Sequence, residues 1–194
     1  FERLARHLSD VLDEIGIPDI HPSLGARHGT WRRSYAGWLA VVDRWAAGDQ
    51  KPHPKAIGSF FDARLVIGDE DLATDLMTKV RETGAQSPAL LATLLKAARP
   101  SRAKSRTVDL EAEGETVIAA TARLLAIANR IEELSTPQRL AETCAQQQLP
   151  RELRDEITDL HGRFLGWIVR SADADALEGR TPGPVLERED LSEK

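Results

Sequence analysis

KAIGSFFDARLVIGDED, residues 55–71, is the stretch on which the predicted fold depends. Alternate residues from Ile57 to Ile67 are apolar or small, which predicts an extended strand with one buried face. Asp62 and Arg64 fall on the opposite face of this strand. Gly68 ends the run, and Asp69 is suited to cap a following helix because its carboxylate accepts hydrogen bonds from free amides of the first turn.

Asp62 has two interpretations at this stage. It is either a structural carboxylate paired with Arg64 or a neighbouring arginine, or an active-site carboxylate presented where a strand stops at a turn. Strand ends often carry active-site residues, but an exposed acid beside an arginine is common in proteins. The residues alone favour the structural interpretation.

Apolar residues at intervals of three and four predict helices on both sides of this stretch. We expect helices over residues 1–15, from Thr30 to Gly48, from Asp69 to Gly84, from Ser87 and Pro88 to Pro100, after Gly114, from Thr136 and Pro137, and from Pro150 onward. Residues 107–111 are the only other strand candidate. The predicted fold class is therefore mainly α with a small β part (α+β). A sheet of two strands is marginally stable alone, so the strand either leans on helices or belongs to a larger sheet.

Three tryptophans, Trp31, Trp38 and Trp45, recur every seven residues in the helix predicted from Thr30. A stripe with this spacing is typical of a buried helix face. Stacking of nucleic-acid bases on the rings is an alternative, and self-association through this face is another. The first interpretation is favoured because few cations lie nearby.

Composition and charge exclude several classes of protein. The chain has 194 residues, a formal net charge of −5 and a single cysteine, Cys144, so an internal disulfide is excluded and a reducing, cytoplasmic location is expected. No apolar run is long enough for a membrane span. Residues 172–194 carry seven acidic and three basic side chains, leaving the rest nearly neutral, and this balance does not call for nucleic acid as a partner. The first residue, Phe1, suggests a fragment of a longer protein.

Three motifs in order resemble a known family. They are FFDARLVIGD at 60–69, preceded by the tryptophan helix; RTVDLEAEGETVIAATARLLAIAN at 106–129, with an arginine inside a helix; and STPQRL at 135–140. Together they resemble the bacterial DUF294-type nucleotidyltransferases, which are similar to the nucleotidyltransferase region of PII uridylyltransferases. The resemblance spans roughly residues 1–170.

The resemblance implies a site as well as a fold. It implies a helical bundle attached to an incomplete nucleotidyltransferase palm sheet, with boundaries at 1–84 (remainder of the nucleotidyltransferase-like domain), 85–171 (helical bundle) and 172–194 (acidic tail). In such palms carboxylates hold Mg²⁺ against a nucleoside triphosphate. Asp62 would then be a catalytic residue and metal ligand, and Arg64 a nucleotide-binding residue.

Partners are implied by the same resemblance. A nucleotide is the expected ligand, together with a protein substrate, attached CBS or cyclic-nucleotide-binding domains, and a role in bacterial signal transduction. The oligomeric state is not predicted. The acidic tail is expected to be a mobile tail or a strap over the surface.

The sequence also departs from the family pattern. It contains no Gly-Ser turn followed by Asp-x-Asp, the family's principal metal ligands, and Glu111 replaces the lysine of the family's DLK motif. We therefore expect the 194 residues to be inactive in nucleotidyl transfer when isolated. The alternative is a helical protein-interaction or regulatory module without a catalytic role.

Overall fold

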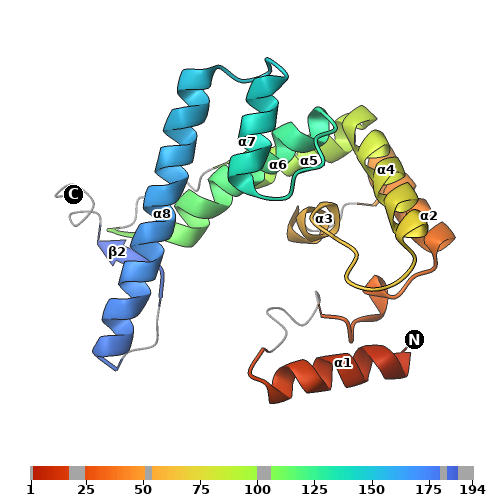
Figure 1. The fold of residues 1–194 in the computed structure, drawn as a ribbon, viewed down its shortest axis with the longest axis horizontal. Helices are drawn as coiled ribbons and strands as arrows, with labels where there is room; N and C mark the ends of the chain where they lie inside the picture. Colours follow the sequence, from red (N-terminus) through yellow and green to blue (C-terminus); the bar gives the residue numbers. More distant parts are fainter. Residues whose placement is uncertain (1, 18–24, 51–53, 100–105, 180–182, 188–194) are drawn as a thin grey trace.

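The fold is mainly helical with one small sheet (Figure 1). The computed structural model describes residues 2–17, 25–50, 54–99, 106–179 and 183–187. The helices are α1 Glu2–Glu14, α2 Tyr35–Ala47, α3 Pro54–Phe61, α4 Glu70–Gln86, α5 Pro88–Ala97, α6 Thr116–Ala128, α7 Thr136–Ala145 and α8 Arg151–Leu177, with a 3₁₀ turn η1 at Gly29–Trp31 and a π-helical turn η2 at Glu111–Glu115; the strands are β1 Thr107–Asp109 and β2 Val185–Glu187. The predicted fold class is confirmed. None of the helices in the described ranges has the length and apolar character to span a membrane.

Most helix starts fall where the sequence placed them, because side chains there accept hydrogen bonds from the first turn. Asp69 accepts from the Leu72 amide at 2.9 Å, and Ser87 accepts from the Leu90 amide at 3.1 Å. The tryptophan helix differs: its cap is Ser34, so α2 begins at Tyr35 and not at Thr30. Trp31 lies in η1 instead.

The predicted strand over residues 57–67 is wrong. The segment forms helix α3 up to Phe61 and then a turn. Ile57, Phe60 and Phe61 are buried at helical spacing, whereas Val66 and Ile67, placed on opposite strand faces by the sequence, are both almost fully exposed. A short apolar run fits both the alternation of a strand and the three-to-four-residue spacing of a helix. Packing against neighbouring helices decided between the two. The expected palm strand is therefore absent from this segment.

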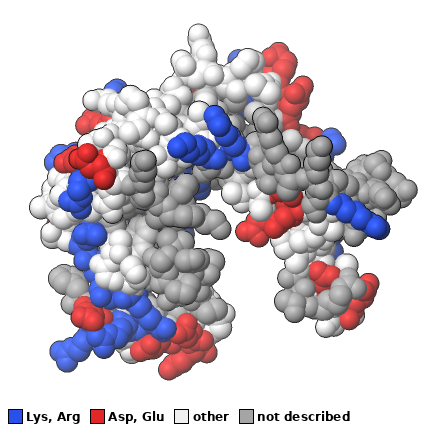
Figure 2. Space-filling model, turned by 180° about the vertical axis from the view of Figure 1, so that it is seen from behind, with Lys and Arg blue, Asp and Glu red and all other residues white. Residues whose placement is uncertain are grey.

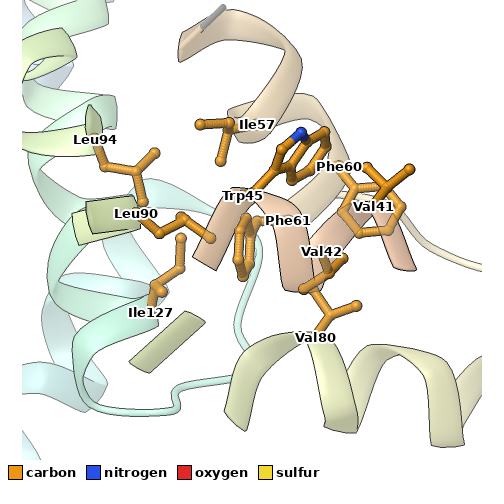
Figure 3. Close-up of a cluster of buried hydrophobic side chains, with 10 residues drawn as sticks. All are labelled: Val41, Val42, Trp45, Ile57, Phe60, Phe61, Val80, Leu90, Leu94 and Ile127. Carbon is orange, nitrogen blue, oxygen red and sulfur yellow. The ribbon is translucent and has the colours of Figure 1, made fainter. Parts of the chain in front are cut away.

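The largest apolar core joins α2, α3, α4, α5 and α6 (Figure 3). Its buried members are Val41, Val42, Trp45, Ile57, Phe60, Phe61, Val80, Leu90, Leu94 and Ile127. Phe60 stacks on Trp38 at a centroid distance of 4.5 Å and meets Trp45 edge-on at 5.7 Å. Trp31 and Trp38 pack partly buried against the same core. The core interpretation of the tryptophan stripe is confirmed.

A smaller apolar cluster holds α6, α7 and α8. Its buried members are Ala122, Leu140 and Leu149. Figure 1 shows α7 and α8 as an antiparallel hairpin beside α6, away from α2 and α4. Gly114 allows η2 to pack closely against α8, because a Cβ at this position would lie 2.1 Å from the Phe164 ring of α8. The apolar residues of α8 are only partly buried, because Leu153 and Leu160 are exposed.

The C-terminal segment is ordered further than the sequence suggested. Helix α8 continues past Ala172 to Leu177, and β2 pairs antiparallel with β1, with Val108 opposite Leu186. The predicted strand near 107–111 is thus confirmed, and its partner comes from the segment predicted to be a tail or strap. Residues 180–182 and 188–194 of that segment lie outside the described residues.

Candidate functional site

Asp62 lies immediately after α3 and binds two arginines from distant parts of the chain. Arg123 of α6 donates from Nε to both carboxylate oxygens, at 3.2 and 3.0 Å, and from one terminal nitrogen at 2.6 Å. Arg139 of α7 donates a further hydrogen bond at 2.5 Å. Both carboxylate oxygens of Asp62 therefore accept charge-assisted hydrogen bonds, which are stronger than neutral ones.

Arg139 is held in place from several directions. Its Nε donates to the carbonyl oxygen of Glu133 at 2.7 Å, and its own carbonyl accepts from the Thr143 hydroxyl at 2.7 Å. Ser135 caps the start of the same helix. Because the side chain of Arg139 is only 4% exposed, its charge depends on Asp62 for compensation.

Gly58 makes room for the other arginine. A Cβ at this position would lie 3.2 Å from a terminal nitrogen of Arg123 and 3.3 Å from its Cζ. The absent side chain lets the guanidinium lie flat against the last turn of α3. Gly58 and Asp62, four residues apart, thus form one binding surface for the Arg123 guanidinium.

The cluster of Asp62, Arg123 and Arg139, called the arginine clasp below, has a closed side and an open side. Arg139 lies on the closed side, whereas Asp62 and Arg123 keep 29% and 22% of their side-chain surface exposed. Two guanidinium groups against one carboxylate leave an excess positive charge. The open side can therefore attract an anion, and planar guanidinium donors suit phosphate and carboxylate groups.

Arg64, the predicted nucleotide-binding residue, lies two residues beyond Asp62. It is exposed in the turn between α3 and α4. The arginines that bind Asp62 come from α6 and α7 and not from this position. Arg64 is thus close to the clasp along the chain, and its predicted role stays a prediction.

The described residues do not fit a magnesium ion at Asp62. Within the described ranges there is no group of three or more histidine, cysteine, aspartate or glutamate side chains that could hold a metal. Both oxygens of Asp62 are occupied by guanidinium groups, and Mg²⁺ requires oxygen ligands. The metal-binding and catalytic roles of Asp62 stay predictions that rest on the resemblance.

A known protein family matches more than half of the chain. Residues 76–194 match the family described as the putative nucleotidyltransferase substrate binding domain, DUF294_C. The chain belongs to this family. No curated protein and no solved structure matches the chain. The DUF294_C match includes both arginines of the clasp and leaves Asp62 just outside, so the clasp ties the segment before the matched domain to the domain itself.

Sequence reasoning singled out Asp62 but did not assign Arg123 and Arg139 to a site. The signal was present, because each arginine lies in one of the motifs that suggested the family. What could not be read from the sequence was their meeting point, since Asp62 and Arg139 are 77 residues apart in the chain. Helix packing alone brings the three motifs together.

Proposed function

We propose that this chain is the substrate-positioning helical part of a metal-dependent nucleotidyltransferase that acts in bacterial signal transduction in the cytoplasm. The family match supports the coarse assignment. The observation that supports a substrate-positioning role is the arginine clasp. It fixes the end of α3 to α6 and α7 and leaves a partly open, positively charged edge. The catalytic Asp-x-Asp of the reaction is supplied from outside these 194 residues.

The proposed ligand is a nucleoside triphosphate bound by its phosphates at the open edge of the clasp. The side chain of Arg123 keeps 22% of its surface exposed at this edge. Arg64, which is exposed and lies two residues beyond Asp62 in the chain, is proposed as a second cation. Asp62 has a positioning role here, because it holds Arg123 in the orientation that phosphates require.

The decisive test is calorimetric titration of nucleoside triphosphates into the chain, with and without Mg²⁺. Arg64→Ala is expected to weaken binding by about tenfold, the loss of one charge-assisted contact, without changing the melting temperature. The matched control is Arg44→Ala, an exposed arginine on α2. Absence of binding, or equal weakening by both variants, would contradict the proposed nucleotide site.

A second measurement tests the proposal that this chain positions the substrate but does not itself catalyse nucleotide transfer. The isolated chain is expected to show no Mg²⁺-dependent incorporation of labelled nucleotide into any acceptor. If it did transfer nucleotide, and Asp62→Ala abolished the transfer, Asp62 would be a catalytic metal ligand and the positioning role would be wrong.

A non-catalytic interaction module is the second candidate function. It is favoured by apolar side chains exposed on α1 and on α8, such as Leu8 and Val169, which an enzyme domain does not need for chemistry. In that case nucleotide binding would be absent while partner binding through these surfaces would be retained.

A further inference from the structure

Helix α1 exposes an apolar stripe. Leu4, Leu8 and Val11 are 66%, 51% and 38% exposed, and Ile15 is 64% exposed. Ile15 continues the stripe because its amide still bonds to the Val11 carbonyl at 3.2 Å. Within the described residues this face is exposed to solvent. A contiguous exposed apolar stripe on a helix marks an interaction surface.

A different face attaches α1 to the rest of the chain. Ser9 is buried, and Ala5 and Leu12 are partly buried about a quarter turn from the stripe. Arg27 bonds to both Asp10 and Asp13. The attached face leaves the stripe open, and Figure 1 shows α1 along the edge of the molecule, apart from α2 and α4. A partner can therefore reach the stripe without displacing α1.

The stripe has the spacing of a coiled-coil seam. Its four residues are separated by four, three and four positions, as in a seam of alternating a and d positions. The order is also symmetric end to end. An antiparallel second copy therefore places Leu4 opposite Ile15 and Leu8 opposite Val11, so every stripe residue meets one from the other copy.

Charges beside the stripe favour the same arrangement. Arg3 and His7 border the N-terminal half of the stripe, and Glu14 borders the C-terminal half, on the flank opposite Ala5 and Leu12. Figure 2 shows both basic and acidic side chains at the lower left, in the region of α1. In an antiparallel pair the basic half of one helix lies against the acidic half of the other. In a parallel pair the side that carries His7 and Glu14 would instead face Ala5 and Leu12 of the other copy.

We propose that two copies of the chain associate through an antiparallel pair of α1 helices, with Leu4, Leu8, Val11 and Ile15 as the seam. The interface is isologous, so each residue contributes twice and one substitution acts at two places. The inference is independent of the proposed function, since neither the clasp nor Arg64 takes part in it.

Sedimentation equilibrium of the 194-residue chain tests the inference. We expect a dimer at about 100 µM. Leu8→Asp should weaken association by about a hundredfold or more, because two carboxylates would enter one apolar seam. The matched control is Val66→Asp, an exposed apolar residue outside α1, which should leave the dimer intact. A chain that is monomeric at these concentrations would overturn the inference.

Charge reversal and cross-linking test the direction of the pair. Arg3→Glu and Glu14→Arg should each weaken the dimer, and the double variant should restore it, because the opposite charges are exchanged. In a Cys144→Ser background, chains with Arg3→Cys should form disulfides with Glu14→Cys chains faster than with each other. A dimer that survives Leu8→Asp, or that cross-links Arg3→Cys to itself preferentially, would contradict the antiparallel seam and point to another face, such as that of Trp31 and Trp38.

Discussion

The two halves of the molecule are held together by different means. The half built from α2 to α5 surrounds a large apolar core that includes Trp45, Phe60 and Phe61. Among the described residues, the half built from α6 to α8 has a smaller cluster of its own, with Ala122, Leu140 and Leu149 as its buried members, and meets the first half at the arginine clasp. Apolar burial is non-directional, whereas charged hydrogen bonds require one geometry. The difference suggests that the first half supplies stability and the junction fixes orientation.

The largest expected effect is the loss of stability on disrupting the apolar core of the first half. Phe61→Ala removes a ring that is buried against Gly84, in the same core as Ile127, and should lower the free energy of unfolding by about 3–5 kcal/mol. Urea denaturation measures it, with the exposed Val66→Ala as the control. An effect below about 1 kcal/mol would mean that this core is not the main source of stability.

The next effect breaks the junction. Asp62→Ala leaves the buried Arg139 uncompensated and should cost about 2–3 kcal/mol, less than a fully buried pair because Asp62 is partly exposed. Arg64→Ala in the same turn is the control and should change little.

A double variant sharpens this test of the junction. Arg139→Met combined with Asp62→Ala should cost less than the sum of the two single changes, because the second change removes a charge that the first left unpaired. Strict additivity in urea denaturation would show that the two side chains do not depend on each other.

A smaller effect compares one helix cap in each half. Ser87 caps α5, donates to the Ala46 carbonyl of α2 at 2.8 Å and is buried, whereas Ser135 caps α7 from an exposed position. Ser87→Ala should cost about 2 kcal/mol and Ser135→Ala about 1 kcal/mol, since the first also leaves a buried carbonyl unpaired. Thermal denaturation of both variants measures the difference. Equal losses would show that the contact between α5 and α2 is energetically unimportant.

The smallest effect concerns an exposed ion pair within α4, between Asp75 and Lys79, which also hydrogen-bonds to Tyr35 of α2. The pKa of Asp75 is lowered from its ordinary value of 3.8, first by the hydrogen bond from Lys79 and then by that from Tyr35. A lowered carboxylate pKa adds stability at neutral pH, and this contribution is lost as the pH falls below about 4 through the folded-state value. Asp75→Asn should therefore reduce the difference in urea midpoint between pH 7 and pH 3. An unchanged difference would mean that the pair adds no stability.

How much the sequence predicted depended on how local the signal was. Caps at Asp69 and Ser87 and the breaks at Gly16 and Gly48 were predicted correctly, because a cap or a positive φ involves only neighbouring residues. The strand over 57–67 was predicted wrongly, because Ile57, Phe60 and Phe61 fit a helix as well once other helices cover them. Of the candidate site, Asp62 was found and its partners were not.

The sequence by itself determined the helical class, most helix boundaries and the family, since these follow from periodicity, capping and motif order along the chain. Only the tertiary structure decided that Asp62 binds Arg123 and Arg139, that the C-terminal segment supplies β2, and that the stripe on α1 is exposed among the residues that the structure describes. The physical reason is that these are contacts between distant segments. Their energies depend on which surfaces meet, and that is set by packing of the whole chain rather than by any one stretch.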